Sequence, residues 1–194
     1  EAGEAELVYC THCDYAANVE KAESLAPSRE KTGKREALTP VSTPGARTVQ
    51  DLERFFQRPA SDMIKTLIYR SGETVVAALV RGDHAVNPIK LARAIGSLEV
   101  ELADDETIGR VTGAPRGFAG PVGLSGCRII ADPAVMEIEN GISGGNATDV
   151  HLTGINPQRD FTPDLVVDIR MAVPGDPCLC KQGTLQGARG IEVG

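Results

Sequence analysis

The sequence lacks any apolar run close to the roughly 18 residues that a membrane-spanning helix needs, and no signal-peptide pattern opens it. We therefore expect no membrane partner. It also lacks an initial methionine, and its last residues, RGIEVG, resemble a structural element that has been interrupted. These two features lead us to expect a piece excised from a longer chain.

The sequence is also short of positive charge. It has 20 Lys and Arg against 27 Asp and Glu, a net charge of −7. Because binding to long nucleic acids relies on clustered cations, we do not expect this chain to hold a duplex by itself. Its one basic cluster, Arg29, Lys31, Lys34 and Arg35, lies in a polar stretch, which favours a solvated mobile loop over a tRNA contact. A nucleic-acid partner must be held mainly by something else, or touched at one small spot.

The familiar catalytic motifs are missing as well. We find no Ser-His-Asp order, no paired carboxylates, no His-rich metal motif, no Gly-Lys-Ser/Thr phosphate loop and no dinucleotide fingerprint. Chemistry in this chain would have to rest on backbone groups, water and the substrate itself.

Local patterns predict several elements within one core of 194 residues. Helices are expected over 48–58, 87–95 and 104–113, with Thr48, Asn87 and Asp104 as N-caps. Strands are expected over 63–70, 74–82, 97–103 and 127–132, followed by a glycine-rich bend and a strand that carries His151. Residues 24–47 are expected to form a loop. Because several links are too short for parallel crossovers, the pattern predicts an α/β fold: a mixed β-sheet surrounded by helices.

Lys65 is the one lysine within the first predicted strand, in the segment SDMIKTLIYR. Such a lysine can protect a sheet edge against aggregation, or extend along apolar groups to reach water. In a dry pocket it can instead hold a phosphate or a carbonyl oxygen. The loop GAPRGFAGPVGL has glycines that would let a ligand approach its backbone, although a plain connecting loop would have the same pattern.

Histidine and aspartate give weaker signals. His151 starts a strand, where a lone histidine is commonly a satisfied structural residue, and the same holds for His84 and His12. Asp132 precedes Pro133 at a strand end, where Asp-Pro commonly begins a turn.

Of the five cysteines, Cys127 lies in an apolar strand and is expected to be a small core residue. The other four, Cys10 and Cys13 near the beginning and Cys178 and Cys180 near the end, could close a tetrahedral zinc site. The alternative is reduced thiols in a cytosolic protein.

Eight segments carry a resemblance that extends in consistent order across nearly the whole chain: CDYAANVEKAE, STPGARTVQDL, KTLIYR, ALVRGDHAVNPIKL, GFAGPVG, DVHLTGINPQRDF, DIRMAVPGDPC and RGIEVG. They resemble the editing domain inserted in bacterial-type prolyl-tRNA synthetases, together with its flanking strands. Free-standing aminoacyl-tRNA deacylases of the YbaK type share the fold of that domain.

The resemblance implies an α/β domain that hydrolyses alanyl-tRNA made in error on the proline tRNA, in the cytoplasm and without a cofactor for editing. It implies that Lys65 is the essential lysine and that Gly117 to Pro121, including Gly120, form the active-site loop. Thr43 would bind the substrate, and His151 and Asp132 would belong to the pocket. The expected partners are the 3′ aminoacylated end of the proline tRNA and the remainder of the synthetase chain.

We accordingly expect flanking segments at 1–40 and 171–194 and an editing domain at 41–170. Two other interpretations stay open. The chain could be a free-standing deacylase, or a non-catalytic module, clipped by zinc, that positions the tRNA acceptor end.

Overall fold

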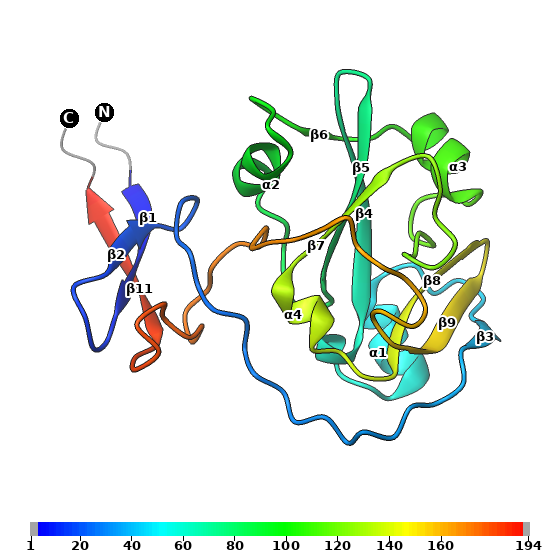
Figure 1. Cartoon of the computed structure of the whole chain (residues 1–194), viewed down its shortest axis with the longest axis horizontal. Helices are drawn as coiled ribbons and strands as arrows, with labels where there is room; N and C mark the ends of the chain where they lie inside the picture. The colour runs from blue at the N-terminus through cyan, green and yellow to red at the C-terminus, as the bar shows by residue number, and fades with distance from the viewer. Residues whose placement is uncertain (1–3, 192–194) are drawn as a thin grey trace.

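A computed structural model of the chain describes residues 4–191 (Figure 1). Its main sheet has five strands in the order β10-β7-β5-β4-β6, and their bounds are β4 Ile64–Ser71, β5 Thr74–Arg81, β6 Glu101–Leu102, β7 Arg128–Ala131 and β10 Leu165–Val166. Strand β4 is antiparallel to β5 and β6, whereas β7 is parallel to β5 and β10. The mixed sheet is therefore confirmed. β5 lies at its centre, and its side chains from Val76 to Val80 are fully buried.

The helices begin where their capping residues predict. They are α1 Val49–Phe56, α2 Pro88–Ile95, α3 Asp105–Thr112 and the short α4 Pro133–Met136, with a 3-10 turn at Ala60–Asp62. Thr48 and Asp51 form a reciprocal capping box at α1, and Asn87 and Asp104 cap α2 and α3. The predicted strand over 97–103 shortens to β6. Within α1, Leu52 is buried but Phe55 is 48% exposed.

A second sheet corrects the predicted glycine-rich bend. Its order is β3-β9-β8, with bounds β3 Thr39–Ser42, β8 Gly141–Ala147 and β9 Val150–Ile155. The segment that was expected to bend is strand β8, which forms a hairpin with β9, and the expected loop over 24–47 contains β3. Gly144 explains the difference, because a Cβ there would lie 2.2 Å from the carbonyl oxygen of Phe118. Glycine is needed at this point for close backbone packing rather than for a turn.

A small sheet lies to one side of this body (Figure 1) and joins the two ends of the chain in the order β11-β1-β2. Its strands are β1 Glu4–Cys10, β2 Ala16–Asn18 and β11 Leu185–Ile191, and it has its own core around Val8 and Leu185. It is built from the segments predicted to flank the editing domain. β3 spans the predicted boundary at residue 40, and the functional boundaries stay a prediction.

Buried Arg170 ties the small sheet to the body. Its guanidinium donates to Asp176 Oδ2 at 2.6 Å, to Ser24 Oγ at 2.8 Å and to the Leu25 carbonyl at 3.1 Å. The side chain is only 1% exposed, so these partners supply the hydrogen bonds that water would otherwise make.

The stretch with the basic cluster is not a freely solvated loop. Arg29 pairs with Asp62 and donates to the Ser61 carbonyl at 2.9 Å, and Lys31 pairs with Glu137 at 3.0 Å. Carboxylates of the body thus contact this segment at Arg29 and Lys31, whereas Lys34 and Arg35 are exposed to solvent, and the mobility of the segment stays a prediction. Between residues 4 and 191, no helix has the length and apolar character needed to span a membrane.

Candidate active site

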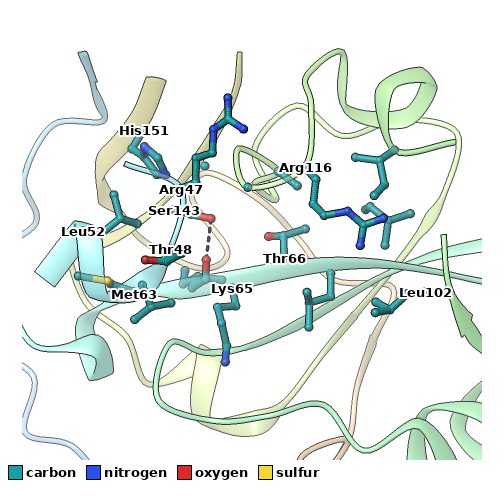
Figure 2. A pocket seen from close by; sticks show the side chains of 18 residues that line it. Arg47, Thr48, Leu52, Met63, Lys65, Thr66, Leu102, Arg116, Ser143 and His151 are labelled. Carbon is teal, nitrogen blue, oxygen red and sulfur yellow. Dashed lines mark hydrogen bonds between the residues drawn. The ribbon is translucent and has the colours of Figure 1, made fainter. Parts of the chain in front are cut away.

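A cavity of about 300 Å³ lies between the first half of β4, the start of α1, the 116–119 loop and the β8–β9 hairpin (Figure 2). Its wall has an apolar part from Val49, Leu52 and Met63, and polar groups from Arg47, Lys65, Thr66, Arg116, Ser143 and His151. Ser143 Oγ donates to the Ile64 carbonyl at 2.8 Å, and this bond fixes β8 against β4. The cavity thus forms where the two sheets of the body meet.

Lys65 lines the cavity from β4. At this position β4 pairs with β5 on one side, and among the described residues no strand pairs with it on the other side, because β6 pairs only with Tyr69 and Arg70. Burial lowers the pKa of its ammonium, and nearby Asp83 opposes this change. The Lys65 ammonium makes no hydrogen bond or salt bridge with another residue between 4 and 191. In Figure 2 its side chain leaves β4 in the direction opposite to that of Thr66. The result is a half-buried cation that is available to a ligand.

His151 is joined to Thr43 by a hydrogen bond of 2.6 Å between Nδ1 and the hydroxyl. Both residues are buried, with exposures of 1% and 0%. The antiparallel pairing of β3 with β9 places Val41 opposite His151 and so brings Thr43 to the imidazole. Burial lowers the pKa of His151, although Asp149 opposes the shift, so the ring is neutral at pH 7. The imidazole lines the cavity, whereas Thr43 stands behind it.

The 117–121 loop is closely packed against β8. Gly117 lines the cavity with φ at +101°, a value that favours glycine. A Cβ on Gly120 would lie 1.7 Å from the Gly144 carbonyl oxygen, so the two backbones touch. Of the loop expected at the site, Gly117 and Ala119 line the cavity, whereas Gly120 and buried Pro121 do not.

Asn146 holds this loop in place. Its Oδ1 accepts from the Gly120 amide at 2.8 Å, and its Nδ2 donates to the carbonyls of Gly120 at 3.1 Å and Val122 at 2.9 Å. The backbone amide of Asn146 donates to the Phe118 carbonyl at 3.0 Å. Sequence reasoning missed Asn146, whose one signal was its position in the glycine-rich segment.

Asp132 lies away from the cavity, contrary to the expectation from the resemblance. Its carboxylate caps α4 by accepting from the Ala134 amide at 2.9 Å, and it also accepts from the Ile169 amide at 3.3 Å. Burial raises the pKa of this carboxyl, while those amides and Arg170 at 3.9 Å stabilise its charge. The Asp-Pro pair thus begins a helix, the structural role that its pattern had left open.

The four terminal cysteines meet at the end of the small sheet. Cys10 and Cys180 have sulfurs 3.7 Å apart, those of Cys13 and Cys178 are 3.8 Å apart, and all four lie within 4.8 Å of one another. Zinc–thiolate bonds of about 2.3 Å place tetrahedral sulfurs roughly 3.8 Å apart. The four thiols could therefore bind a metal ion. Cys127, by contrast, packs against the main core, as predicted.

Known proteins match this chain in two ways: one family model matches its central part, and curated relatives match its full length. The family described as "aminoacyl-tRNA editing domain" matches residues 43–161. Proline–tRNA ligases from Desulforamulus reducens and Geobacter metallireducens are 49% and 50% identical to it over 195 residues, which cover 100% of this chain and 34% of each relative. The chain thus spans about a third of the length of these curated relatives.

Among solved structures, a proposed trans-editing enzyme for prolyl tRNA synthetase superposes with a TM-score of 0.60 at 18% identity, covering 69% of this chain and 86% of that one. A hypothetical protein gives a TM-score of 0.61 at 21% identity, covering 69% and 91%. At such low identity these two similarities concern the fold.

Proposed function

The chain belongs to the aminoacyl-tRNA editing domain family, and from this premise we propose that its cavity hydrolyses alanyl-tRNA mischarged on the proline tRNA. Family membership supports the deacylation of aminoacyl-tRNA in general. The observation that carries the finer proposal is that Lys65, Gly117 and His151 line one small cavity, in a chain that aligns along its full length with proline–tRNA ligases. The rest of such a ligase would hold the body of the tRNA.

The substrate follows from the physics of selection. A pocket built for proline cannot strongly exclude alanine, because the smaller side chain fits wherever the larger one fits, and each missing methylene is worth only about 1–3 kcal/mol. A second site that admits alanine and rejects proline by size removes the error. The apolar part of this cavity is suited to a small side chain.

The reaction is hydrolysis of an ester. Water attacks the carbonyl carbon, the bond from that carbon to the ribose oxygen breaks, and the ribose oxygen takes up a proton. Such a step needs a positioned water and stabilisation of the oxyanion. We assign Lys65 to hold the aminoacyl carbonyl or a phosphate, and the backbone of Gly117 to orient the water with help from the substrate's 2′-hydroxyl.

The other expected site residues act by positioning the groups that contact the substrate and the water. The amide and carbonyl of Gly120 are already bonded to Asn146, so Gly120 and Pro121 position the loop rather than contact the water. Thr43 orients His151, and His151 forms the wall of the aminoacyl pocket. A neutral imidazole could also serve as a general base. Replacing His151 by Ala distinguishes these roles, since a wall residue should relax selectivity toward prolyl-tRNA and a base should abolish hydrolysis of both substrates.

The deciding experiment compares hydrolysis of alanyl- and prolyl-tRNA, both bearing the proline anticodon. It uses the wild-type chain, Lys65→Ala, and Lys21→Ala as a control at an exposed lysine outside the cavity. We expect release of alanine only, reduced about 100-fold or more in Lys65→Ala and unchanged in Lys21→Ala. Equal release of both amino acids, or none, would contradict the proposal.

We also propose that the four clustered cysteines bind a structural zinc ion that ties together the two ends of the chain. The tetrahedral fit of their sulfurs supports this. Metal analysis of protein purified without chelator should give about one equivalent of zinc. Less than about a tenth of an equivalent would discard the site.

A further inference from the structure

The cations around the cavity are not all neutralised. Three line it, namely Arg47, Lys65 and Arg116. Arg116 pairs with Asp105 at 3.0 Å and donates to the Ala103 carbonyl at 3.1 Å. Arg47 and Lys65 form no salt bridge with any residue from 4 to 191. In a chain of net charge −7, the unpaired guanidinium of Arg47 at the cavity indicates that the cavity receives an anion.

The guanidinium of Arg47 has no carboxylate partner among residues 4–191, and an aromatic ring holds it instead. Its guanidinium lies over the ring of Phe118, 5.6 Å from the centroid, and that ring is fully buried. Its backbone amide donates to Asp51 Oδ2 at 3.3 Å. A Cβ on Gly117 would lie 3.2 Å from Arg47 Cβ, so the two segments are in contact. The Arg47 guanidinium is therefore held at the rim of the cavity by its contacts with Phe118 and Gly117.

The two unpaired cations point in different directions. In Figure 2 the guanidinium of Arg47 extends away from β4, and the ammonium of Lys65 extends on the opposite side of the strand. They are therefore not placed to bind a single anionic group together.

The charges of the proposed substrate limit what Arg47 can bind. An aminoacyl ester carries no negative charge, and its α-amino group is a cation. The anions nearest to the ester are the backbone phosphates of the tRNA. A planar guanidinium matches the geometry of a phosphate better than an ammonium does.

We propose that Arg47 binds the phosphate that joins the last two nucleotides of the aminoacyl-tRNA, and thereby positions the terminal nucleoside over the cavity. This assignment rests on the proposed editing function and adds a substrate-binding residue to it. With Arg47 on the phosphate, Lys65 is assigned to the aminoacyl carbonyl of the substrate.

The test compares substrates with and without that phosphate. Alanyl-tRNA and the phosphate-free ester 3′-O-alanyl-adenosine are given to wild type, Arg47→Ala and Arg54→Ala. Arg54 is a matched control, because its replacement removes the same charge from nearby α1 but leaves the cavity lining intact. For Arg47→Ala we expect KM for alanyl-tRNA to rise about tenfold at nearly unchanged kcat. The slope of log(kcat/KM) against log salt should become shallower by about 0.7, the loss of one single-strand phosphate contact. Hydrolysis of alanyl-adenosine should not change.

An equal loss on both ester substrates would overturn the proposal, as would Arg47→Ala behaving like Arg54→Ala. Binding of the dinucleotide cytidylyl-(3′→5′)-adenosine and of adenosine, followed by NMR, separates this inference from the editing function. Tighter binding of the dinucleotide, lost in Arg47→Ala, would support the phosphate site even in a chain that hydrolyses nothing. Equal binding of dinucleotide and adenosine by wild type would reject the site even in a chain that releases alanine.

Discussion

Replacing Gly120 by alanine should damage both the stability of the chain and its deacylation activity. The new Cβ would lie 1.7 Å from the Gly144 carbonyl oxygen. Carbon and oxygen approach no closer than roughly 3.3 Å without strain, so the loop or β8 would have to retreat by about 1.6 Å. Both contacting groups are backbone, which cannot rotate away as a side chain would.

The cost can be worked out from the bonds involved. A retreat of that size breaks the two hydrogen bonds between Gly120 and Asn146, at 2.8 and 3.1 Å, which contribute about 1 kcal/mol each. Overpacking adds about 1–3 kcal/mol. The free energy of unfolding should therefore fall by about 3–5 kcal/mol. Because the movement displaces Gly117 at the cavity, alanyl-tRNA hydrolysis should fall about 100-fold.

Urea unfolding and single-turnover deacylation measure the two effects. Gly109→Ala is the control, since this glycine lies within α3 and an added Cβ would meet no side chain or neighbouring element within 4 Å among residues 4–191. That substitution should raise the free energy of unfolding by about 0.5–1 kcal/mol and leave hydrolysis unchanged. If Gly120→Ala unfolds and hydrolyses like wild type, the close packing of the loop on β8 is refuted.

Four further predictions follow from buried groups and charge. Thr66→Val should raise the free energy of unfolding by about 1 kcal/mol, because the buried Thr66 hydroxyl has no partner among the described residues; a decrease on urea unfolding would contradict this. Burial lowers the pKa of His84 to about 4, so the unfolded chain takes up that proton at a higher pH than the folded one. Stability present above pH 6.5 should thus be lost as the pH falls toward 4, by about 3 kcal/mol, and His84→Gln should flatten this part of the curve. Arg170→Met should cost about 3–5 kcal/mol in thermal or urea unfolding, because it leaves buried Asp176 without its cation. Finally, the acidic chain should bind tRNA weakly, and a submicromolar Kd at physiological salt would show that its surface holds more than the 3′ end.

The elements that sequence predicts correctly are those whose signals are local. The N-caps Thr48, Asn87 and Asp104 act within three residues of themselves, so they mark the helices without knowledge of the fold. The unbroken apolar run of β5 likewise predicts a strand buried on both faces. β8 could not be predicted in this way. Its glycines have little strand propensity, and what makes Gly144 part of a strand is the backbone of Phe118, which is distant in sequence.

The candidate site depends still more on distant contacts. Thr43 and His151 are 108 residues apart, and only the pairing of β3 with β9 brings them together. The resemblance indicated Lys65, Gly117 and His151, which do line one cavity, but it also indicated Asp132, which caps a helix instead. Arg47 gave no signal in the sequence because its importance comes from lacking a carboxylate partner among the described residues, and the absence of a partner is visible only in three dimensions.

The proposed rejection of proline by size requires a cavity wall that cannot move outward. Two of the apolar side chains that line the cavity, Leu52 and Met63, belong to the core rather than to a loop. Leu52 and Met63 pack with fully buried Ile142 in one cluster, so widening the cavity there would disturb core packing. Forcing extra volume into such a core typically costs about 1–3 kcal/mol, which is comparable to the discrimination that one methylene can provide. Arg47, in contrast, lies on the rim, where a phosphate can arrive from solvent. Selection by size and capture of the tRNA end are thus separated, with the first assigned to the most rigid part of the cavity and the second to its most accessible part.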